Sequence, residues 1–150
     1  MDNSRFRFRA WDKFNKIMHY DFQFIKSGEE GNDWICFISD KQPMKCDKTK
    51  IIFDNPYFRQ QIEIMQCTGL KDKNGKLIYE GDILGGIYHG YIEYCNECKC
   101  FQLKVKDYGC LACEGDIHWY ELVEAEEQNE LEVIGNIYEN PELLKECEDE

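Results

Sequence analysis

The sequence contains few of the residues from which hydrolytic and nucleotide-binding sites are built. Only three residues are serine and two are threonine. No serine lies in a G-x-S-x-G motif, which argues against a Ser-His-Asp hydrolase. The sequence has no Walker A loop, and no G-x-G-x-x-G follows a predicted strand and opens a helix. None of the histidines (His19, His89 and His118) belongs to an H-E-x-x-H motif, and we expect each in a turn or on a strand face. Together these absences predict a protein that is not an enzyme.

The chain also lacks a long apolar segment. No apolar run approaches the roughly 20 residues that cross a bilayer, and the N-terminal MDNSRFRFRAWDKF has no signal-peptide core. Nine cysteines without an export signal indicate reduced thiols in a cytosol, and an odd number excludes complete pairing within one chain. We therefore expect a cytoplasmic protein that does not bind membranes.

Positive charge is scarce in the last quarter of the chain. The net charge is −12, and residues 114–150 hold one lysine, Lys145, against 14 acidic residues, a balance of −13. Residues 1–66 carry a balance of +1. An acidic segment of this kind repels phosphate backbones and attracts basic partners, so nucleic acid is an unfavoured partner. It either maintains solubility or binds a basic partner.

The sequence does contain many short strand patterns separated by turn residues. Its length of 150 residues fits a single domain, with two subdomains over about 1–60 and 61–150 as an option. The pattern predicts a mostly β fold, α+β at most, built as a barrel or meander of short strands with one or two short helices. The expected elements are a hairpin over 5–25, a polar loop over 39–50, a helix start at Asn55-Pro56, a hairpin over 87–94, strands over 34–38, 62–67, 101–106, 119–123 and 131–134, and a short helix from Asn140-Pro141.

The stretch TGLKDKNGKLIYEGDIL, residues 68–84, could line a phosphate or metal site because it combines glycines with carboxylates. Asn74-Gly75, however, is typical of a type I′ hairpin turn, in which both central residues have positive φ. Gly81-Asp82 then turns the chain again into Ile83-Leu84. We therefore interpret this stretch as two turns and not as a ligand site.

Four cysteines form a C-x2-C-x11-C-x2-C pattern, which is close to the spacing of structural zinc sites. The predicted strand over 101–106 would span about 20 Å at ~3.3 Å per residue and so separate the two pairs. Neither pair is followed directly by glycine, as expected of a tight metal-binding turn. We favour apolar packing of thiols at strand ends over a zinc site or a redox pair, and assign no cofactor. The metal-ligand candidates are Cys95, Cys98, Cys110 and Cys113, with Cys100 between them.

Three blocks that span most of the chain carry a family resemblance. They are FRAWDK at 8–13 with Lys16 and Met18, QCTGLKDKNG at 66–75 running into IYEGDI at 78–83, and EVIGNIYENPELL at 132–144. Together they resemble the YopX-like family of bacteriophage and prophage proteins. The resemblance implies a small, mostly β phage protein that can form oligomers in the cytoplasm of a bacterial host. It transfers no catalytic residue, because the family has no established biochemical activity.

The resulting functional prediction is a non-enzymatic accessory or assembly module that acts through protein contacts. Its predicted partners are other copies of itself in a homo-oligomer, or a phage or host protein, through exposed aromatic residues such as Phe6, Trp11 or Tyr91. The alternatives are an acidic, DNA-mimicking host-interference protein and a zinc-binding nucleic-acid module. The latter would rely on Lys99, Lys104 and Lys106 for phosphate contacts.

Overall fold

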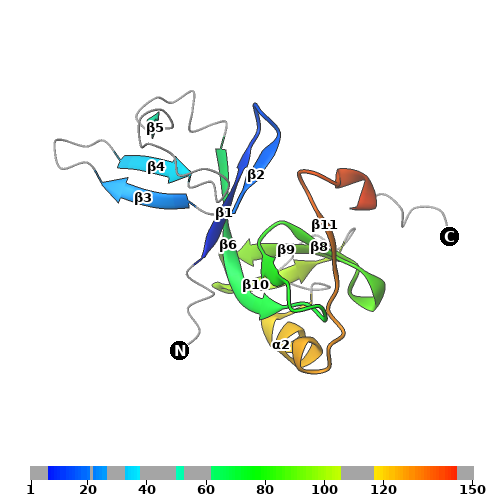
Figure 1. Ribbon diagram of the computed structural model, residues 1–150. Coiled ribbons are helices and arrows are strands. Elements are labelled where there is room, and N and C mark those ends of the chain that lie inside the picture. Colours follow the sequence, from blue (N-terminus) through cyan, green and yellow to red (C-terminus); the bar gives the residue numbers. More distant parts are fainter. Residues whose placement is uncertain are drawn as a thin grey trace. The chain divides into compact units, whose positions relative to one another are not determined.

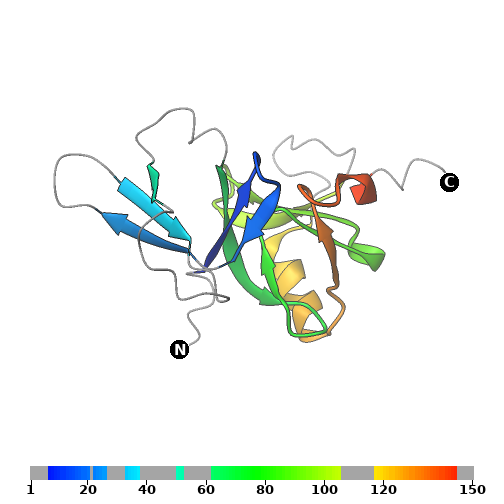
Figure 2. The same ribbon diagram turned by 45° about the horizontal axis from the view of Figure 1, so that its top comes forward.

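The computed structural model describes residues 7–20, 22–26, 33–37, 50–52, 62–105 and 117–144 (Figures 1 and 2). The fold is mostly β, as predicted, with a single α-helix within these residues. The chain forms two compact units, Phe8–Met65 and Met1–Arg7 with Gln66–Glu150. None of the described helices has both the length and the apolarity that crossing a membrane requires.

The unit Phe8–Met65 contains the predicted N-terminal hairpin. Strand β1 (Phe8–Asp12) pairs antiparallel with β2 (Ile17–His19), and Trp11 lies opposite Met18. A separate sheet follows with the order β3-β4-β5, made of Phe22–Lys26, Asp33–Phe37 and Lys50–Ile52. The polar loop predicted over 39–50 lies outside the described residues except for Lys50, which begins β5, and the helix start predicted at Asn55-Pro56 lies outside them entirely.

Strand β6 (Ile62–Lys71) runs through both units. Its first four residues belong to Phe8–Met65 and the remainder to the other unit. The sheet that contains it has the order β2-β1-β6-β7, and β7 spans Leu77–Tyr79. The ten-residue length of β6 reflects its β-branched and apolar positions, of which Ile62, Met65, Cys67, Thr68 and Leu70 are buried.

The unit made of Met1–Arg7 and Gln66–Glu150 is built on another antiparallel sheet, with the order β10-β9-β8-β11. The strands are β8 (Asp82–Leu84), β9 (Gly90–Cys95), β10 (Cys100–Lys104) and β11 (Val133–Asn136). Two 3-10 helices, η2 (Gly86–Tyr88) and η3 (Pro141–Leu144), connect or follow them. The helix predicted from Asn140-Pro141 is thus a 3-10 turn, and Ile87-Tyr88, which the sequence pattern placed in a hairpin arm, belongs to η2.

A hydrophobic core joins this sheet to helix α2 (Trp119–Glu127). Leu122 and Ala125, three residues apart on one helix face, are fully buried, and α2 packs against β10 (Figure 1). Burying a leucine side chain contributes about 1.5–3 kcal/mol, so this short helix is held mainly by its packing. The rest of the buried core consists of Leu70, Ile78, Leu84, Ile92, Phe101, Leu103 and Leu131.

The strand predicted over 119–123 was wrong, because this segment begins α2. Trp119, Tyr120 and Val123 favour strands, but a capping box outweighs that preference. The side chain of Glu121 accepts a hydrogen bond from the His118 amide at 2.9 Å, and the Glu121 amide donates to the His118 carbonyl at 3.1 Å. The strong helix formers that follow then extend the helix to Glu127.

Buried Asp and Asn side chains hold the turns between strands. Asp12 accepts hydrogen bonds from the amides of Phe14 and Asn15, both at 2.9 Å, and from the Asn15 side chain at 2.7 Å. In the C-terminal turn, the Asn136 side chain accepts hydrogen bonds from the amides of Tyr138 and Glu139 at 3.0 and 2.9 Å. Each side chain replaces the hydrogen bonds that the backbone amides lose when the strand ends.

The Asn74-Gly75 hairpin is confirmed, but its predicted type I′ turn was wrong. Only Gly75 has positive φ (79°), and β6 and β7 pair on either side of it. The Gly75 amide donates to the Asp72 carbonyl, and the Asp72 amide donates to Lys76, both at 2.8 Å. This is a type I turn followed by a left-handed glycine, and the buried Asp72 carboxylate selects it by accepting the amides of Asn74 and Lys76.

Candidate functional site

The first candidate site is the turn between β9 and β10, which carries three cysteines. Cys95 and Cys100 lie directly opposite each other in the antiparallel register, and residues 96–99 connect them. The Lys99 amide donates to the Cys95 carbonyl at 2.9 Å, and the Cys98 amide donates to the Cys95 Sγ at 3.4 Å. Lys99 has a positive φ of 57°. The residue after the second cysteine of this turn thus adopts the left-handed conformation although it is not glycine.

The three thiols differ in their surroundings. Cys95 is buried, Cys98 is exposed and Cys100 is half-buried, and all three are thiols in this structure. Burial and the neighbouring sulfurs of Cys98 and Cys95 raise the pKa of the Cys100 thiol. Among the described residues no group of three or more His, Cys, Asp or Glu side chains is arranged as a metal site. Cys110 and Cys113 lie outside the described residues, so the four-cysteine site stays a prediction.

An aromatic cluster supports the base of this hairpin. The rings of Tyr94 and Phe101 meet edge to face with centroids 5.4 Å apart, and Phe101 also contacts the Trp119 ring at 6.1 Å. Edge-to-face pairs of this kind are favourable beyond the area they bury. The cysteine turn therefore projects from a packed part of the core.

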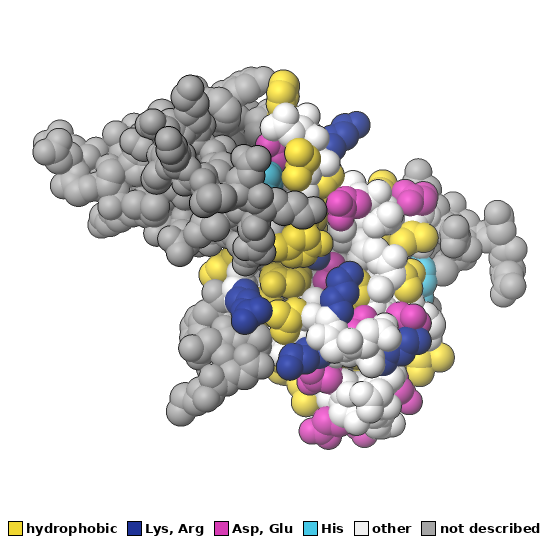
Figure 3. All heavy atoms as spheres, viewed as in Figure 1, with side chains coloured by type: hydrophobic (Ala, Val, Ile, Leu, Met, Phe, Trp, Pro, Cys, Tyr) yellow, Lys and Arg dark blue, Asp and Glu magenta, His cyan; other side chains and the backbone are white. Residues whose placement is uncertain are grey.

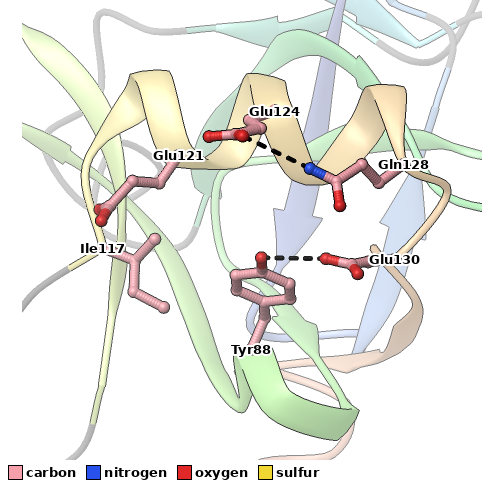
Figure 4. Close-up of a pocket in the computed structure, with 6 residues that line it drawn as sticks. All are labelled: Tyr88, Ile117, Glu121, Glu124, Gln128 and Glu130. Carbon is pink, nitrogen blue, oxygen red and sulfur yellow. Dashed lines mark hydrogen bonds between the residues drawn. The ribbon is translucent and has the colours of Figure 1, made fainter.

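The second candidate site is an acidic pocket of about 300 Å³ beside α2 (Figure 4). Glu121 and Glu124 come from the helix, Glu130 follows it, and Tyr88 enters from η2. The Tyr88 hydroxyl donates to Glu130 at 3.1 Å. Burial, that hydrogen bond and the surrounding carboxylates raise the pKa of Tyr88. Ile117 and Gln128 complete the lining, and the arrangement suits a basic or cationic group.

The sequence prediction missed this pocket because it placed a strand at 119–123. With a helix assigned there, Glu121, Glu124 and Gln128 would share one face through their spacing of three and four residues. The acidic excess of residues 114–150 had signalled the charge but not its location.

The third candidate site is the end of the β1–β2 hairpin, where apolar side chains meet solvent. Phe14 in the turn is 74% exposed, and Ile17 next to the turn is 50% exposed. Tyr20, which follows the other end of β2, is also 50% exposed. Figure 3 shows hydrophobic side chains at the end of this hairpin beside a basic side chain. Trp11, predicted to be an exposed contact residue, is instead buried, because its position on β1 faces the interior. Tyr91 is half-buried, and Phe6 lies outside the described residues.

Acidic side chains in the stretch at 68–84 hold turns of the chain. Its Asp72 carboxylate holds a turn, and Asp82 accepts the Tyr79 amide at 2.8 Å while nearly fully buried. Burial alone would raise the pKa of Asp72, but hydrogen bonds from Lys76, Asn74 and Val133 outweigh it and lower that pKa. The predicted structural role of this stretch is confirmed by these contacts.

The histidines are distributed over separate elements. His19 is the last residue of β2. Burial lowers the pKa of His19, and this outweighs the opposite effect of the nearby Asp12 charge. His118 caps α2, and His89 follows η2. The prediction of strand and turn positions holds for His19 and His89, whereas His118 caps a helix that was not predicted.

The family model described as YopX protein matches residues 7–145. The chain belongs to the YopX family. Among solved structures, this YopX-family chain is similar to the crystal structure of protein EF1440 from Enterococcus faecalis, with 30% sequence identity and a TM-score of 0.52. The similarity covers 92% of this chain and 96% of that one. The curated proteins provide no match.

Proposed function

We propose that this YopX-family protein is a non-enzymatic accessory or assembly module of a phage or prophage. It acts through protein contacts in the cytoplasm of a bacterial host and associates with copies of itself. The observation that carries this proposal is the exposed apolar surface of the β1–β2 hairpin, formed by Phe14 in the turn, Ile17 at the start of β2 and Tyr20 just beyond the other end of β2. Three large apolar side chains within seven residues form a contact surface more readily than scattered single residues do.

Charge complementarity favours a second copy as the partner. The hairpin turn carries Lys13 and Lys16, whereas residues 114–150 have a balance of −13. Lys13 forms an ion pair with Glu63 on the neighbouring strand, which orients its side chain at the hairpin. The hairpin of one copy can therefore bind the acidic surface near α2 of another copy, and contacts of this head-to-tail kind build rings or filaments.

The test is the mass of the full-length chain in solution, measured by sedimentation or light scattering over a range of concentrations. We expect oligomers, and we expect Phe14→Ser with Ile17→Ser to shift the equilibrium to monomer by at least about tenfold. Ile87→Ser is the matched control, because Ile87 is 80% exposed but lies in η2 of the other unit. A wild-type chain that remains monomeric at high concentration would contradict the self-association.

A second candidate function is host interference through the acidic pocket. The grouping of Glu121, Glu124 and Glu130 around Tyr88 favours it, since a basic DNA-binding protein could place a lysine or arginine there. Capture of basic host proteins from a lysate at low salt, reduced by Glu121→Gln with Glu124→Gln, would support this function. Recovery of none would exclude it.

A further inference from the structure

The turns at 13–16 and 96–99 have the same backbone. Each links two paired antiparallel strands through four residues, Asp12 opposite Ile17 in one and Cys95 opposite Cys100 in the other. In each, the amide of the fourth turn residue donates to the carbonyl of the residue before the turn, at 2.8 Å for Lys16 and 2.9 Å for Lys99. Those two lysines have φ of 55° and 57°. Asp12 and Cys95 are therefore equivalent positions, as are Asn15 and Cys98.

In the first turn, the side chains at these two positions meet. The Asn15 amide donates to the Asp12 carboxylate at 2.9 Å, and the Asn15 side chain donates to the same carboxylate at 2.7 Å. In the second turn the corresponding amide, that of Cys98, donates to the Cys95 sulfur at 3.4 Å. By analogy with the Asn15–Asp12 contact, the shared backbone brings the Cys98 side chain within reach of the Cys95 sulfur. It also presents an N–H group to the atom that would carry the negative charge of a thiolate.

Packing accounts for Cys95 but not for Cys98. Cys95 is 8% exposed at the end of β9, where a small apolar side chain fits. Cys98 is exposed, so its sulfur fills no part of the core. We propose that Cys95 and Cys98 form a two-thiolate turn that binds a thiophilic divalent metal ion such as Zn²⁺.

The chemistry of binding is ligand exchange without redox. Each thiol releases its proton to the solvent, and each thiolate replaces a water molecule on the metal ion. Zinc in structural sites takes four ligands, so two positions remain for other groups or water. The N–H donated to Cys95 acts as an outer-shell contact that orients and stabilises the thiolate.

Cobalt(II) titration of the full-length, reduced chain, purified without chelator or nickel, tests this site. Sulfur-to-cobalt charge-transfer absorption in the near ultraviolet reports metal–thiolate bonds directly. We expect the absorption in the wild type, its displacement by Zn²⁺, and at least a tenfold weaker affinity in Cys98→Ser. Asn96→Ser, an exposed position in the same turn, serves as the matched control and should retain wild-type affinity.

Circular dichroism of Cys98→Ser confirms that the variant is folded, which its exposed position favours. Absence of charge-transfer absorption in the wild type would overturn the proposal. Wild-type affinity in folded Cys98→Ser would overturn it as well, because the metal would then bind elsewhere.

Discussion

The β1–β2 and β9–β10 hairpins close with the same backbone turn but hold it with different side chains. Asp12 receives hydrogen bonds from two amides and from the Asn15 side chain, all within the turn. At the equivalent positions the Cys95 sulfur accepts a hydrogen bond from the Cys98 amide, and both side chains are thiols. One turn therefore joins an acceptor to a donor, whereas the other brings together two potential metal ligands. The comparison shows that a backbone conformation leaves the chemistry of a turn open until its side chains are considered.

The largest expected effect comes from converting the second turn into the first. Cys95→Asp with Cys98→Asn rebuilds the Asp12–Asn15 pair on the same backbone. We expect the metal-free double variant to fold with a stability within about 1 kcal/mol of wild type, since the turn hydrogen bonds are replaced. It should lose the cobalt–thiolate absorption. Urea unfolding and cobalt titration measure the two properties, and retention of the absorption would separate the metal site from this turn.

The next effect is the loss of the carboxylate in the first turn. Asp12→Ala leaves the amides of Phe14 and Asn15 without their acceptor, and we expect it to destabilise the fold by about 2–3 kcal/mol in urea or thermal unfolding. Asp12→Asn keeps one oxygen acceptor and should lose less. Equal losses in the two variants would show that the charge, and not the acceptor geometry, stabilises the turn.

The carboxylates also predict an acid dependence that the thiol turn does not share. Burial would raise the pKa of Asp12, but the hydrogen bonds from Asn15 and Phe14 lower it below its ordinary value of 3.8. A carboxylate whose pKa is lowered by folding stabilises the protein above its unfolded pKa, and this stability is lost as the pH falls through the folded pKa. When unfolding is measured from pH 5 downward, the stability of Asp12→Asn should therefore fall less than that of the wild type. An unchanged profile would contradict this assignment.

The smallest effect concerns the left-handed lysines that the two turns share. A residue with a side chain at positive φ destabilises the fold by about 1–2 kcal/mol. Glycine avoids this strain but loses more chain entropy on folding, which offsets part of the gain. Lys16→Gly and Lys99→Gly should each raise thermal stability, by about 0.5–1 kcal/mol. Lys16→Gln and Lys99→Gln remove the charge while keeping the side chain, and they should not produce this gain. A gain at one turn only would show that the two backbones differ in solution.

Local signals in the sequence predicted much of the strand framework. Alternation in 6–11 and the Asn74-Gly75 pair predicted hairpins that the structure contains, because both signals act over a few residues. Helix α2 was not predicted, since its first two residues, Trp119 and Tyr120, are aromatic residues that favour strands. Its decisive features are the His118–Glu121 capping box and the burial of Leu122 against the sheet, and the second depends on the tertiary fold.

The candidate sites were predictable only in part. The Cys95–Cys98 spacing is visible in the sequence, but the absence of glycine argued against a metal-binding turn. The structure shows that Lys99 adopts the required left-handed conformation, which spacing alone cannot indicate. The acidic pocket depends on bringing Tyr88 next to Glu130, which is 42 residues away, and no local pattern encodes that contact.

The buried turn residues also have a consequence for the order in which the chain folds. Asp12 and Asn136 bind amides no more than three residues away, so their turns close at little cost in chain entropy. Asp72 likewise accepts hydrogen bonds from the nearby amides of Asn74 and Lys76, two and four residues away, but it also accepts one from the Val133 amide, 61 residues along the chain. The hairpin around Asn74-Gly75 can therefore form first and present a ready acceptor for the arriving strand β11. The Asp72 carboxylate then contributes twice, first in an early local turn and later in the slow long-range step that completes the β10-β9-β8-β11 sheet.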